Sequence, residues 1–252
     1  MSEKTPKKTD DLICGRNSVE EALKSGRSLN QLFAAGAEGS AGIRRLVSLA
    51  KSAGVPVKEV DSRKLDSLCG GKNHQGVAAF CAAHEYADIE DILEIARSKG
   101  EAPFLIILDG IEDPHNLGAV IRTAEACGAH GVIIPKRRCA ALTETVSKTS
   151  AGAIEYMPVA RVSNLSNTID RLKEQNIWIY GLDMDGQDYR QTDFSGGAAL
   201  VIGSEGRGIS RLVREKCDFT VSIPMRGNVN SLNASVAAGI VMYRASDTLK
   251  DG

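Results

Sequence analysis

Residues 104–135 read FLIILDGIEDPHNLGAVIRTAEACGAHGVIIP, and this stretch decides the fold class. It opens with an almost unbroken apolar run, FLIILDG, which is typical of a strand buried on both faces of a parallel sheet. The segment NLGAVIRTAEACG then has the spacing of an amphipathic helix that ends at a glycine. A second apolar run, GVIIP, follows directly. A strand, a helix and a strand in this order predict a parallel β-α-β unit.

The same alternation continues to the end of the chain. Expected helices cover residues 141–153, 164–176, 209–217 and 233–249, and expected strands cover residues 157–162, 177–183, 198–204 and 219–224. We therefore expect an α/β domain whose parallel sheet is covered by helices on both faces. No period of 20–50 residues is present, which argues against a repeat architecture.

The first part of the chain predicts a smaller unit. Residues 11–83 alternate short strands and helices, and we expect them to form a small α/β domain. The acidic, helical stretch 84–103 ends at a proline and is the expected linker, with one helix of its own. Residues 1–10 are polar and carry lysines, so we expect a disordered tail. Residues 104–252 then form the larger domain.

The composition is that of an ordinary globular protein. The chain has 252 residues, of which 42% are hydrophobic and 25% are charged, and its formal net charge is -1. No global basic field indicates nucleic acid, although a local basic patch would be enough to bind it. Six cysteines without a C-x-x-C pair, and single histidines without a ligand-spaced partner, argue against a metal site. Without a signal peptide or a membrane-spanning run, we expect a reduced, cytoplasmic protein.

Ligands of such sheets bind beyond the carboxyl ends of the strands, and three polar segments follow expected strands there. The first contains the turn DPHN (113–116), in which Asn116 is expected at or near the helix N-cap. Arg122 follows within two helical turns and shares a helix face with Gly118 and Ala119. Because those two residues are small, the arginine can lie over them toward the strand ends. A plain helix cap and a solvated arginine are the purely structural alternatives.

The second and third segments supply the remaining polar groups. GSEGRG (203–208) offers backbone N–H groups, flexible glycines and one carboxylate, Glu205. It lacks the terminal Gly-Lys-Ser/Thr of a P-loop, so a glycine-rich turn is its structural interpretation. NVNSLNASVAAG (228–239) supplies side-chain amides and hydroxyls, with Asn233 where a helix starts. The short basic run PKRRCA (135–140) is expected to be solvated, or to bind phosphates if it borders the strand-end cleft.

Together the three segments resemble the signature motifs of the SpoU/TrmH family, part of the knotted SPOUT superfamily of RNA methyltransferases. The matching stretches are NLGAVIRTA (116–124), VIGSEGRGI (201–209), and IPM with SLNASVA (223–225 and 231–237). Each motif alone is moderately specific, whereas all three in order at strand ends are highly specific. Residues 11–83, including NHQGV at 73–77, resemble the L30e-like substrate-binding domain that precedes the motif region in several members. The layout is most similar to members that methylate a guanosine of 23S rRNA at the ribose 2′-oxygen.

The resemblance implies a trefoil knot within residues ~200–248, which is a rare exception to the rule that connections do not thread loops. It also implies a homodimer and S-adenosylmethionine as the cofactor. The cofactor-binding positions that it implies are Leu182, Ile202, Gly203, Gly206, Ile223, Met225 and Leu232. The catalytic positions that it implies are Asn116, Arg122, Glu205, Ser231 and Asn233.

The implied reaction is in-line transfer of a methyl group from a sulfonium to a ribose 2′-oxygen. A hydroxyl is a poor nucleophile at neutral pH, so it must be held in line and helped to lose its proton. Arg122 matches the arginine that the family uses to activate or orient the hydroxyl. Because arginine stays protonated, we expect Arg122 to act electrostatically and to position a phosphate, and the general base is left open. Asn116 and Glu205 would orient the arginine and the ribose, while Ser231 and Asn233 would shape the site beside the methyl donor.

Two other functions stay open. An L30e-like domain alone binds kinked RNA, so the chain could be a non-catalytic RNA-binding scaffold, although binding alone does not require the full set of motif residues. A tRNA, or a different rRNA nucleotide as in resistance to ribosome-targeting antibiotics, would keep the chemistry and change the substrate. In each case we expect the basic residues Arg16, Arg44, Arg45 and Lys72 of the first domain to dock structured RNA.

Overall fold

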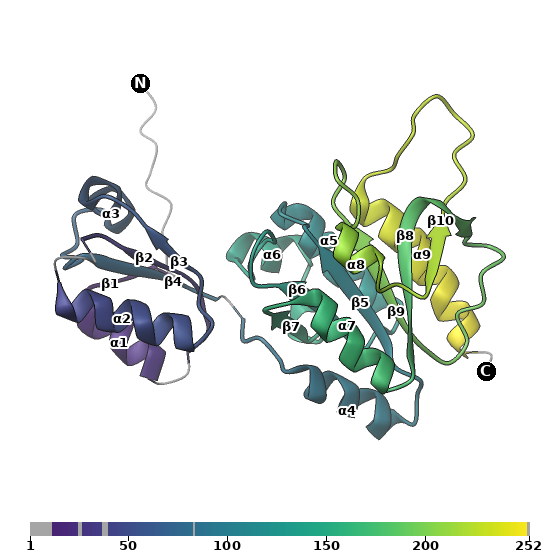
Figure 1. Ribbon diagram of the computed structural model, residues 1–252, viewed down its shortest axis with the longest axis horizontal. Coiled ribbons are helices and arrows are strands. Elements are labelled where there is room, and N and C mark those ends of the chain that lie inside the picture. Colours follow the sequence, from purple (N-terminus) through teal and green to yellow (C-terminus); the bar gives the residue numbers. More distant parts are fainter. Residues whose placement is uncertain (1–11, 25–26, 37–39, 83, 251–252) are drawn as a thin grey trace. The chain divides into compact units, whose positions relative to one another are not determined.

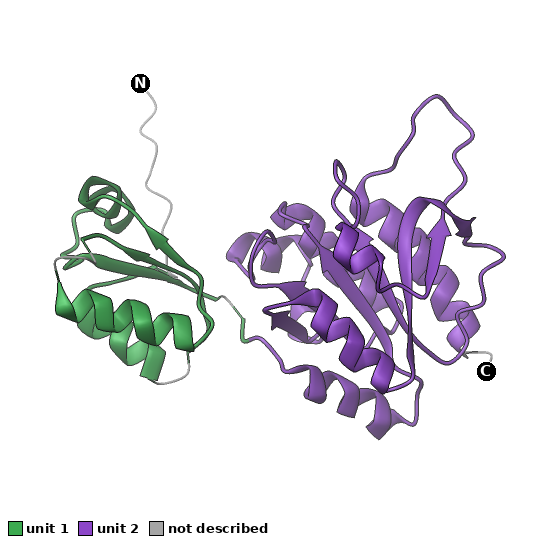
Figure 2. Cartoon of the chain, viewed as in Figure 1, with its two compact units in different colours: residues 1–85 green, residues 86–252 purple. Residues whose placement is uncertain are grey.

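The computed structural model describes residues 12–24, 27–36, 40–82 and 84–250, so the expected tail at residues 1–10 lies outside the described residues. The chain divides into two compact units, Met1–Glu85 and Tyr86–Gly252 (Figure 2). Each unit has its own sheet (Figure 1).

The first unit is a small α/β domain. Its strands are β1 (Leu12–Cys14), β2 (Leu29–Ala34), β3 (Val57–Glu59) and β4 (Val77–Cys81), and its helices are α1 (Arg16–Lys24), α2 (Ala41–Ser52) and α3 (Ser62–Cys69). The strand order is β1-β4-β2-β3; β4 is antiparallel to both of its neighbours, and β2 and β3 are parallel. Apolar residues of α1 and α2 share one core, and those of α3 share a second core on the other face of the sheet.

The second unit is built on a six-stranded sheet in the order β10-β8-β9-β5-β6-β7. Its strands are β5 (Phe104–Asp109), β6 (Gly131–Pro135), β7 (Val159–Val162), β8 (Ile177–Asp188), β9 (Gly197–Gly203) and β10 (Phe219–Ser222). Its helices are α4 (Ile89–Lys99), α5 (Pro114–Ala126), α6 (Glu144–Thr149), the 3₁₀ turn η1 (Ala153–Glu155), α7 (Leu165–Glu174), α8 (Arg211–Arg214) and α9 (Ala234–Lys250). Every neighbouring pair of these strands is parallel, which confirms the predicted fold class.

Alternate residues of β5 pack on opposite faces of this sheet, as the period of a strand requires. Ile106 and Leu108 share one core with apolar residues of α5 and α9. Leu105 and Ile107 share a second core with apolar residues of α4 and α7. The continuous apolar run in β5 is therefore explained by burial on both faces.

Most of the stretch 84–103, which was expected to be a linker, belongs to the second unit. Its helix α4 buries Ile92 and Leu93 in the same core as Ile107. A side chain added at Gly131 would lie 2.6 Å from two carbon atoms of Ile92, so α4 sits directly on the start of β6. The buried apolar stripe makes this segment a covering helix of the sheet and not a connector.

The strand order creates a crevice between β5 and β9. These strands are neighbours, but the chain leaves them in opposite directions: through α5 to β6 on one side, and through α8 to β10 on the other. Such a switch point is where α/β sheets bind their ligands, beyond the carboxyl ends of the strands. The polar segments that begin at Asp109 and Gly203 both start at this crevice.

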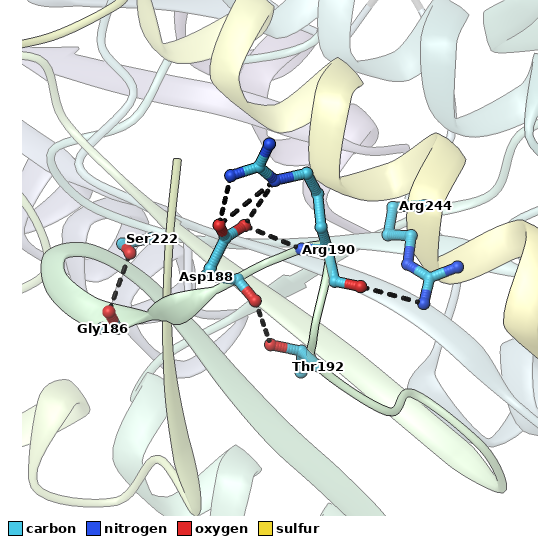
Figure 3. Close-up of polar contacts among 6 residues, drawn as sticks. All are labelled: Gly186, Asp188, Arg190, Thr192, Ser222 and Arg244. Atoms are coloured by element: carbon cyan, nitrogen blue, oxygen red, sulfur yellow. Dashed lines mark hydrogen bonds and ion pairs between the residues drawn. The ribbon is translucent and has the colours of Figure 1, made fainter. Parts of the chain in front are cut away.

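The end of β8 is tied to β10 and to α9 (Figure 3). The Ser222 hydroxyl donates a hydrogen bond to the Gly186 carbonyl at 2.7 Å, which joins β8 to the last residue of β10. The Arg190 guanidinium is paired with the Asp188 carboxylate, with 3.0 Å from Nε to Oδ1. The Arg190 carbonyl accepts a hydrogen bond from Arg244 Nη2 of α9 at 3.3 Å. These contacts hold β8 beside the segment that leaves β10.

None of the helices in the described part of the chain has both the length and the apolar character that a bilayer crossing needs. The described residues contain no group of three His, Cys, Asp or Glu side chains that could hold a metal ion. All six cysteines are free thiols.

Candidate functional site

Three side chains from the three polar segments meet at the crevice between β5 and β9. Asn116 Nδ2 of α5 donates to Glu205 Oε1, which follows β9, at 3.1 Å. Asn233 Nδ2, just before α9, donates to Asn116 Oδ1 at 2.9 Å and also to Glu205 Oε1. The Ala234 N–H adds a fourth bond, to Glu205 Oε1, at 3.3 Å. Residues up to 117 positions apart in the chain thus form one network, which we call the Asn–Glu–Asn cluster (Asn116, Glu205 and Asn233).

Asn116 lies near the start of α5, as expected, but it is not the N-cap itself. The cap is Asp113, whose Oδ1 accepts the His115 N–H at 2.9 Å. Pro114 occupies the first helical position, where its missing N–H costs nothing. Asn116 therefore lies inside the first turn, and its side-chain amide is available to cross to Glu205.

Asn233 serves both the helix and the cluster. Its Oδ1 accepts the N–H groups of Ser235 at 3.0 Å and Val236 at 3.3 Å, so it caps the start of α9. The same amide turns its Nδ2 toward Glu205 and Asn116. The capping bonds thus fix the direction of the donor that enters the cluster.

Glu205 lies in a tight turn that depends on glycine. Ser204 and Gly208 exchange two backbone hydrogen bonds, of 3.2 Å and 2.8 Å, which close the turn. A Cβ atom at Gly203 would lie 2.1 Å from the carbonyl carbon of Gly208, so no larger residue fits there. Gly208 itself has a φ of 63°, a left-handed conformation that glycine adopts at no cost. The turn presents Glu205 at the end of β9.

A cleft of about 680 Å³ opens from the cluster across the carboxyl ends of the strands. It is lined by residues 109–113, 163–166 and 204–208, together with Asn116, Pro135, Arg137, Arg138, Ser210, Leu212 and Val213. The sequence did not single out Asp109, whose Oδ2 accepts the Ser210 N–H at 2.7 Å and ties β5 to the segment after β9. An aspartate at the last position of a buried strand was the available signal for it.

Two of the expected catalytic residues are not in the cluster. Arg122 is exposed on α5 and does not line the cleft. The small residue Gly118 is covered by Thr149 of α6, because an added Cβ would lie 1.9 Å from Thr149 Oγ1; Thr149, and not the arginine, occupies that side of the helix. Ser231 is exposed in the segment between β10 and α9.

The positions expected to bind a cofactor lie at the ends of three strands. Leu182 is on β8, and Ile202 and Gly203 end β9. Ile223, Met225 and Leu232 follow β10, and Gly206 is in the Glu205 turn. Leu182 and Ile223 pack on the core beneath the sheet edge, whereas Met225 is 38% exposed.

The segment 223–232 has free backbone groups. Among the described residues, no backbone hydrogen bond joins any of its N–H or C=O groups to the rest of the chain. Residues 224–231 are exposed, so these donors and acceptors are accessible to water or to a bound molecule.

Two family models match the chain. The model described as "RNA 2'-O ribose methyltransferase substrate binding" matches residues 12–87. The model described as "SpoU rRNA Methylase family" matches residues 103–243, which include all three segments of the cluster.

Curated relatives match along almost the whole length. The Bacillus subtilis protein named "Putative TrmH family tRNA/rRNA methyltransferase YacO" is 51% identical over 234 residues, which are 92% of this chain and 94% of the relative. A Staphylococcus saprophyticus relative with the same family name is 48% identical over 233 residues, 92% of this chain and 93% of its own.

Solved structures share the fold. The SpoU methyltransferase AviRb from Streptomyces viridochromogenes, crystallised with AdoMet, is 27% identical, with a TM-score of 0.60 over 96% of this chain and 91% of AviRb. The A. aeolicus TrmH/SpoU tRNA modifying enzyme is 25% identical, with a TM-score of 0.54 over 64% of this chain and 84% of its own. On the family match over more than half of its length, and on relatives that are about half identical, this chain belongs to the SpoU rRNA methylase family.

Proposed function

We propose that this protein transfers a methyl group from S-adenosylmethionine to a ribose 2′-hydroxyl of RNA, and that its substrate is a guanosine of 23S rRNA. The observation that carries the proposal is the Asn–Glu–Asn cluster. It joins one polar side chain from each of the three family motifs at the switch point of the sheet.

The residues present fit the cofactor. The free backbone groups of residues 223–232 suit the hydrogen-bonding edge of an adenine, and Leu182, Ile202 and Ile223 offer apolar contacts beside them. Gly203, Met225 and Leu232 would complete the site, with Gly206 leaving room in the Glu205 turn. When bound, S-adenosylmethionine supplies a methyl group on a sulfonium that departs as a neutral thioether.

The protein's own contribution is positioning. Glu205 Oε1 accepts three hydrogen bonds from Asn116, Asn233 and Ala234, so its carboxylate is held in one orientation. A fixed carboxylate can accept a hydrogen bond from the ribose 2′-hydroxyl and hold the oxygen in line with the methyl group. Arg122 acts as a permanent positive charge that stabilises the oxygen as it loses its proton.

In a homodimer, a second copy of the chain would cover the exposed Arg122. The surface that α5 and α9 share beside it has a shallow hollow lined by Ala119, Thr123, Ser235, Val236, Gly239, Ile240 and Tyr243. Val236 is 51% exposed and Tyr243 is 54% exposed, which is unusual for side chains of this size on one helix. We propose that a second copy packs on this surface and that Ser231 and Arg122 complete the site in the dimer.

The substrate is the finer part of the proposal. The matching family model names rRNA, and the curated relatives name tRNA and rRNA together. The first unit, which matches a substrate-binding model, supports an RNA substrate that is bound by both units, and we place the reaction in the cytoplasm. The competing functions are a tRNA methyltransferase and a non-catalytic RNA-binding scaffold.

The test is methylation of total RNA from cells that lack the enzyme, with labelled S-adenosylmethionine and mapping of 2′-O-methyl sites. The variants are Arg122→Ala and Glu205→Gln, and Glu174→Gln is the control, since it removes an exposed carboxylate from α7 outside both the cleft and the cluster. One labelled rRNA guanosine, lost in both variants and kept in the control, supports the proposal. Label in tRNA overturns the rRNA substrate alone. No label, with RNA still bound, overturns the enzyme and favours the scaffold.

A further inference from the structure

The cleft that leads from the Asn–Glu–Asn cluster has two walls of different charge. Its acidic residues, Asp109, Glu112, Asp113 and Glu205, lie at the end of β5 and in the loops that follow β5 and β9, a side that also carries Arg207. The other wall is formed by the loops that follow β6 and β7. Among the described lining residues, that wall carries Arg137 and Arg138 and no acidic side chain.

Arg137 and Arg138 are free to bind a ligand. Both are exposed, and within the described part of the chain neither forms an ion pair or a side-chain hydrogen bond. Two other exposed arginines of this unit are engaged, Arg171 with Glu90 and Arg211 with Glu215. Two unpaired guanidinium groups on one wall of a cleft make a site for an anion with several oxygens.

Polar groups from the β7 loop complete the same wall. Ser163, Asn164 and Ser166 line it, and Asn164 caps α7 by accepting the Asn167 N–H at 3.2 Å. The wall therefore combines two cations with hydroxyls and the positive end of a ten-residue helix. The arginines carry the inference, and the helix start adds donors beside them.

We propose that Arg137 and Arg138 bind backbone phosphates of the RNA next to the nucleotide that is methylated, and so position its ribose at the cluster. This inference rests on the proposed function. Both residues are positioning residues, because they lie in the loop after β6, whereas the cluster is formed by residues of α5, of the turn after β9 and of the start of α9. Neighbouring strands are about 4.8 Å apart, so this wall is one to two strand spacings from the reacting ribose, which is the scale of one or two nucleotides.

The two walls suit the two sides of a nucleotide. The phosphates of RNA are anionic and face Arg137 and Arg138, whereas ribose hydroxyls and base amino groups are donors and face the carboxylates. A uniformly basic cleft would bind RNA in any register. A cleft with four carboxylates on one wall, and only arginines as charged side chains on the other, favours one orientation of the strand.

The experiment measures binding of the full-length protein to an unmodified 23S rRNA transcript over a series of KCl concentrations. The variant is Arg137→Ala/Arg138→Ala, and the matched control is Arg171→Ala, which removes an exposed arginine from α7 outside the cleft. The conservative variant Arg137→Lys/Arg138→Lys keeps both charges. Binding of S-adenosylhomocysteine and methyl transfer are measured on the same preparations.

We expect the alanine variant to bind the transcript at least tenfold more weakly at 0.15 M KCl, with its salt slope reduced by about 1 for each arginine removed. The KM for RNA rises while kcat changes less than threefold, and S-adenosylhomocysteine binds as before. The lysine variant recovers most of the slope, and the Arg171 control matches the wild type.

The experiment distinguishes a failure of the phosphate site from a failure of the proposed methyl transfer. A wild-type slope in the alanine variant overturns the phosphate site, whether or not the enzyme is active. An equal loss of S-adenosylhomocysteine binding also overturns it, because the arginines would then act on the whole unit. If the wild type transfers no methyl group but the slope still falls, the proposed reaction fails and the RNA-binding wall stands.

Discussion

At the scale of single residues, Asn233 connects the fold to the chemistry. Its side-chain oxygen caps α9, and its side-chain nitrogen donates to Glu205 and Asn116. The two roles use different atoms of one amide, so substitutions can separate them.

Asn233→Ala removes both roles and Asn233→Asp removes only one. We expect the alanine variant to lose about 1 kcal/mol of unfolding free energy with the cap and about a hundredfold in methyl transfer. The aspartate variant keeps a capping oxygen but places a second carboxylate against Glu205, so it retains the cap and loses the activity. Urea titration and a methylation assay measure the two effects. Equal activity in the aspartate variant and the wild type would show that the nitrogen has no role.

Cys139 predicts a pH dependence of stability. Burial, the largest effect, raises the pKa of this thiol from 9.0 to about 12. Below pH 9 the thiol is neutral in both states; above it the unfolded chain ionises while the folded chain does not, so stability falls between pH 9 and pH 12. From pH 8 to pH 10 this thiol should cost about 1 kcal/mol. Cys139→Ala should show a shallower fall in urea titrations at the two pH values, and an identical fall would contradict the assignment.

The sequence predicted the members of the cluster better than their local roles. Asn116, Glu205 and Asn233 stand at strand ends, and parallel strands bring those ends together. The cap of α5 was expected at or near Asn116 because Asn is a favoured cap, whereas Pro114 prefers the first helical position and leaves Asp113 to cap. No pattern in the sequence shows that Thr149 covers Gly118, since α6 lies about 30 positions further along the chain.

At the scale of elements, the contact between α5 and α6 depends on Gly118. An added Cβ would lie 1.9 Å from Thr149 Oγ1 and 3.1 Å from the backbone nitrogen of Ser150. Gly118→Ala should therefore destabilise the protein by about 1–3 kcal/mol through overpacking, although alanine is the better helix former. The double variant Gly118→Ala/Thr149→Ala removes the closest atom and should recover part of the loss. Additive losses in a double-mutant cycle would mean that the two residues do not clash.

The apolar strands were predicted more accurately than the segments shaped by tertiary contacts. β6 has the residues expected of it and β5 ends one residue earlier than expected, at Asp109, because continuous apolar runs leave little choice. β8 was expected to end at Asp183 but reaches Asp188, since it pairs with β10 again beyond an irregularity. α8 was expected over residues 209–217 and spans only Arg211–Arg214, because Lys216 and Cys217 bond to carbonyls three positions back and form turns.

At the scale of the whole molecule, the proposed homodimer predicts a change of mass. Val236→Asp/Tyr243→Asp places two charges on the exposed apolar surface of α9 and should convert a dimer of twice 26.8 kDa into a monomer in sedimentation velocity. Methyl transfer should fall with it. Met184→Asp is the control, because Met184 is 70% exposed on β8, outside that surface. A control that also dissociates, or a double variant that stays dimeric, would place the interface elsewhere.

The trefoil knot stays a prediction from the resemblance.

Because the two units have separate cores, we expect that the units can be separated from each other. Each buried cluster draws its residues from one unit only: two clusters lie within residues 12–81 and two within residues 86–249. Cutting the chain before Tyr86 therefore opens no core, and the fragment 86–252 should unfold cooperatively with a Tm close to that of its transition in the full chain. It should keep its affinity for S-adenosylhomocysteine, because all the positions assigned to the cofactor lie within it. Its affinity for the 23S rRNA transcript should fall at least tenfold, since the basic residues of the first unit are lost. A fragment that binds the transcript as tightly as the full chain would assign RNA binding to the second unit alone, where Arg137 and Arg138 would then account for it.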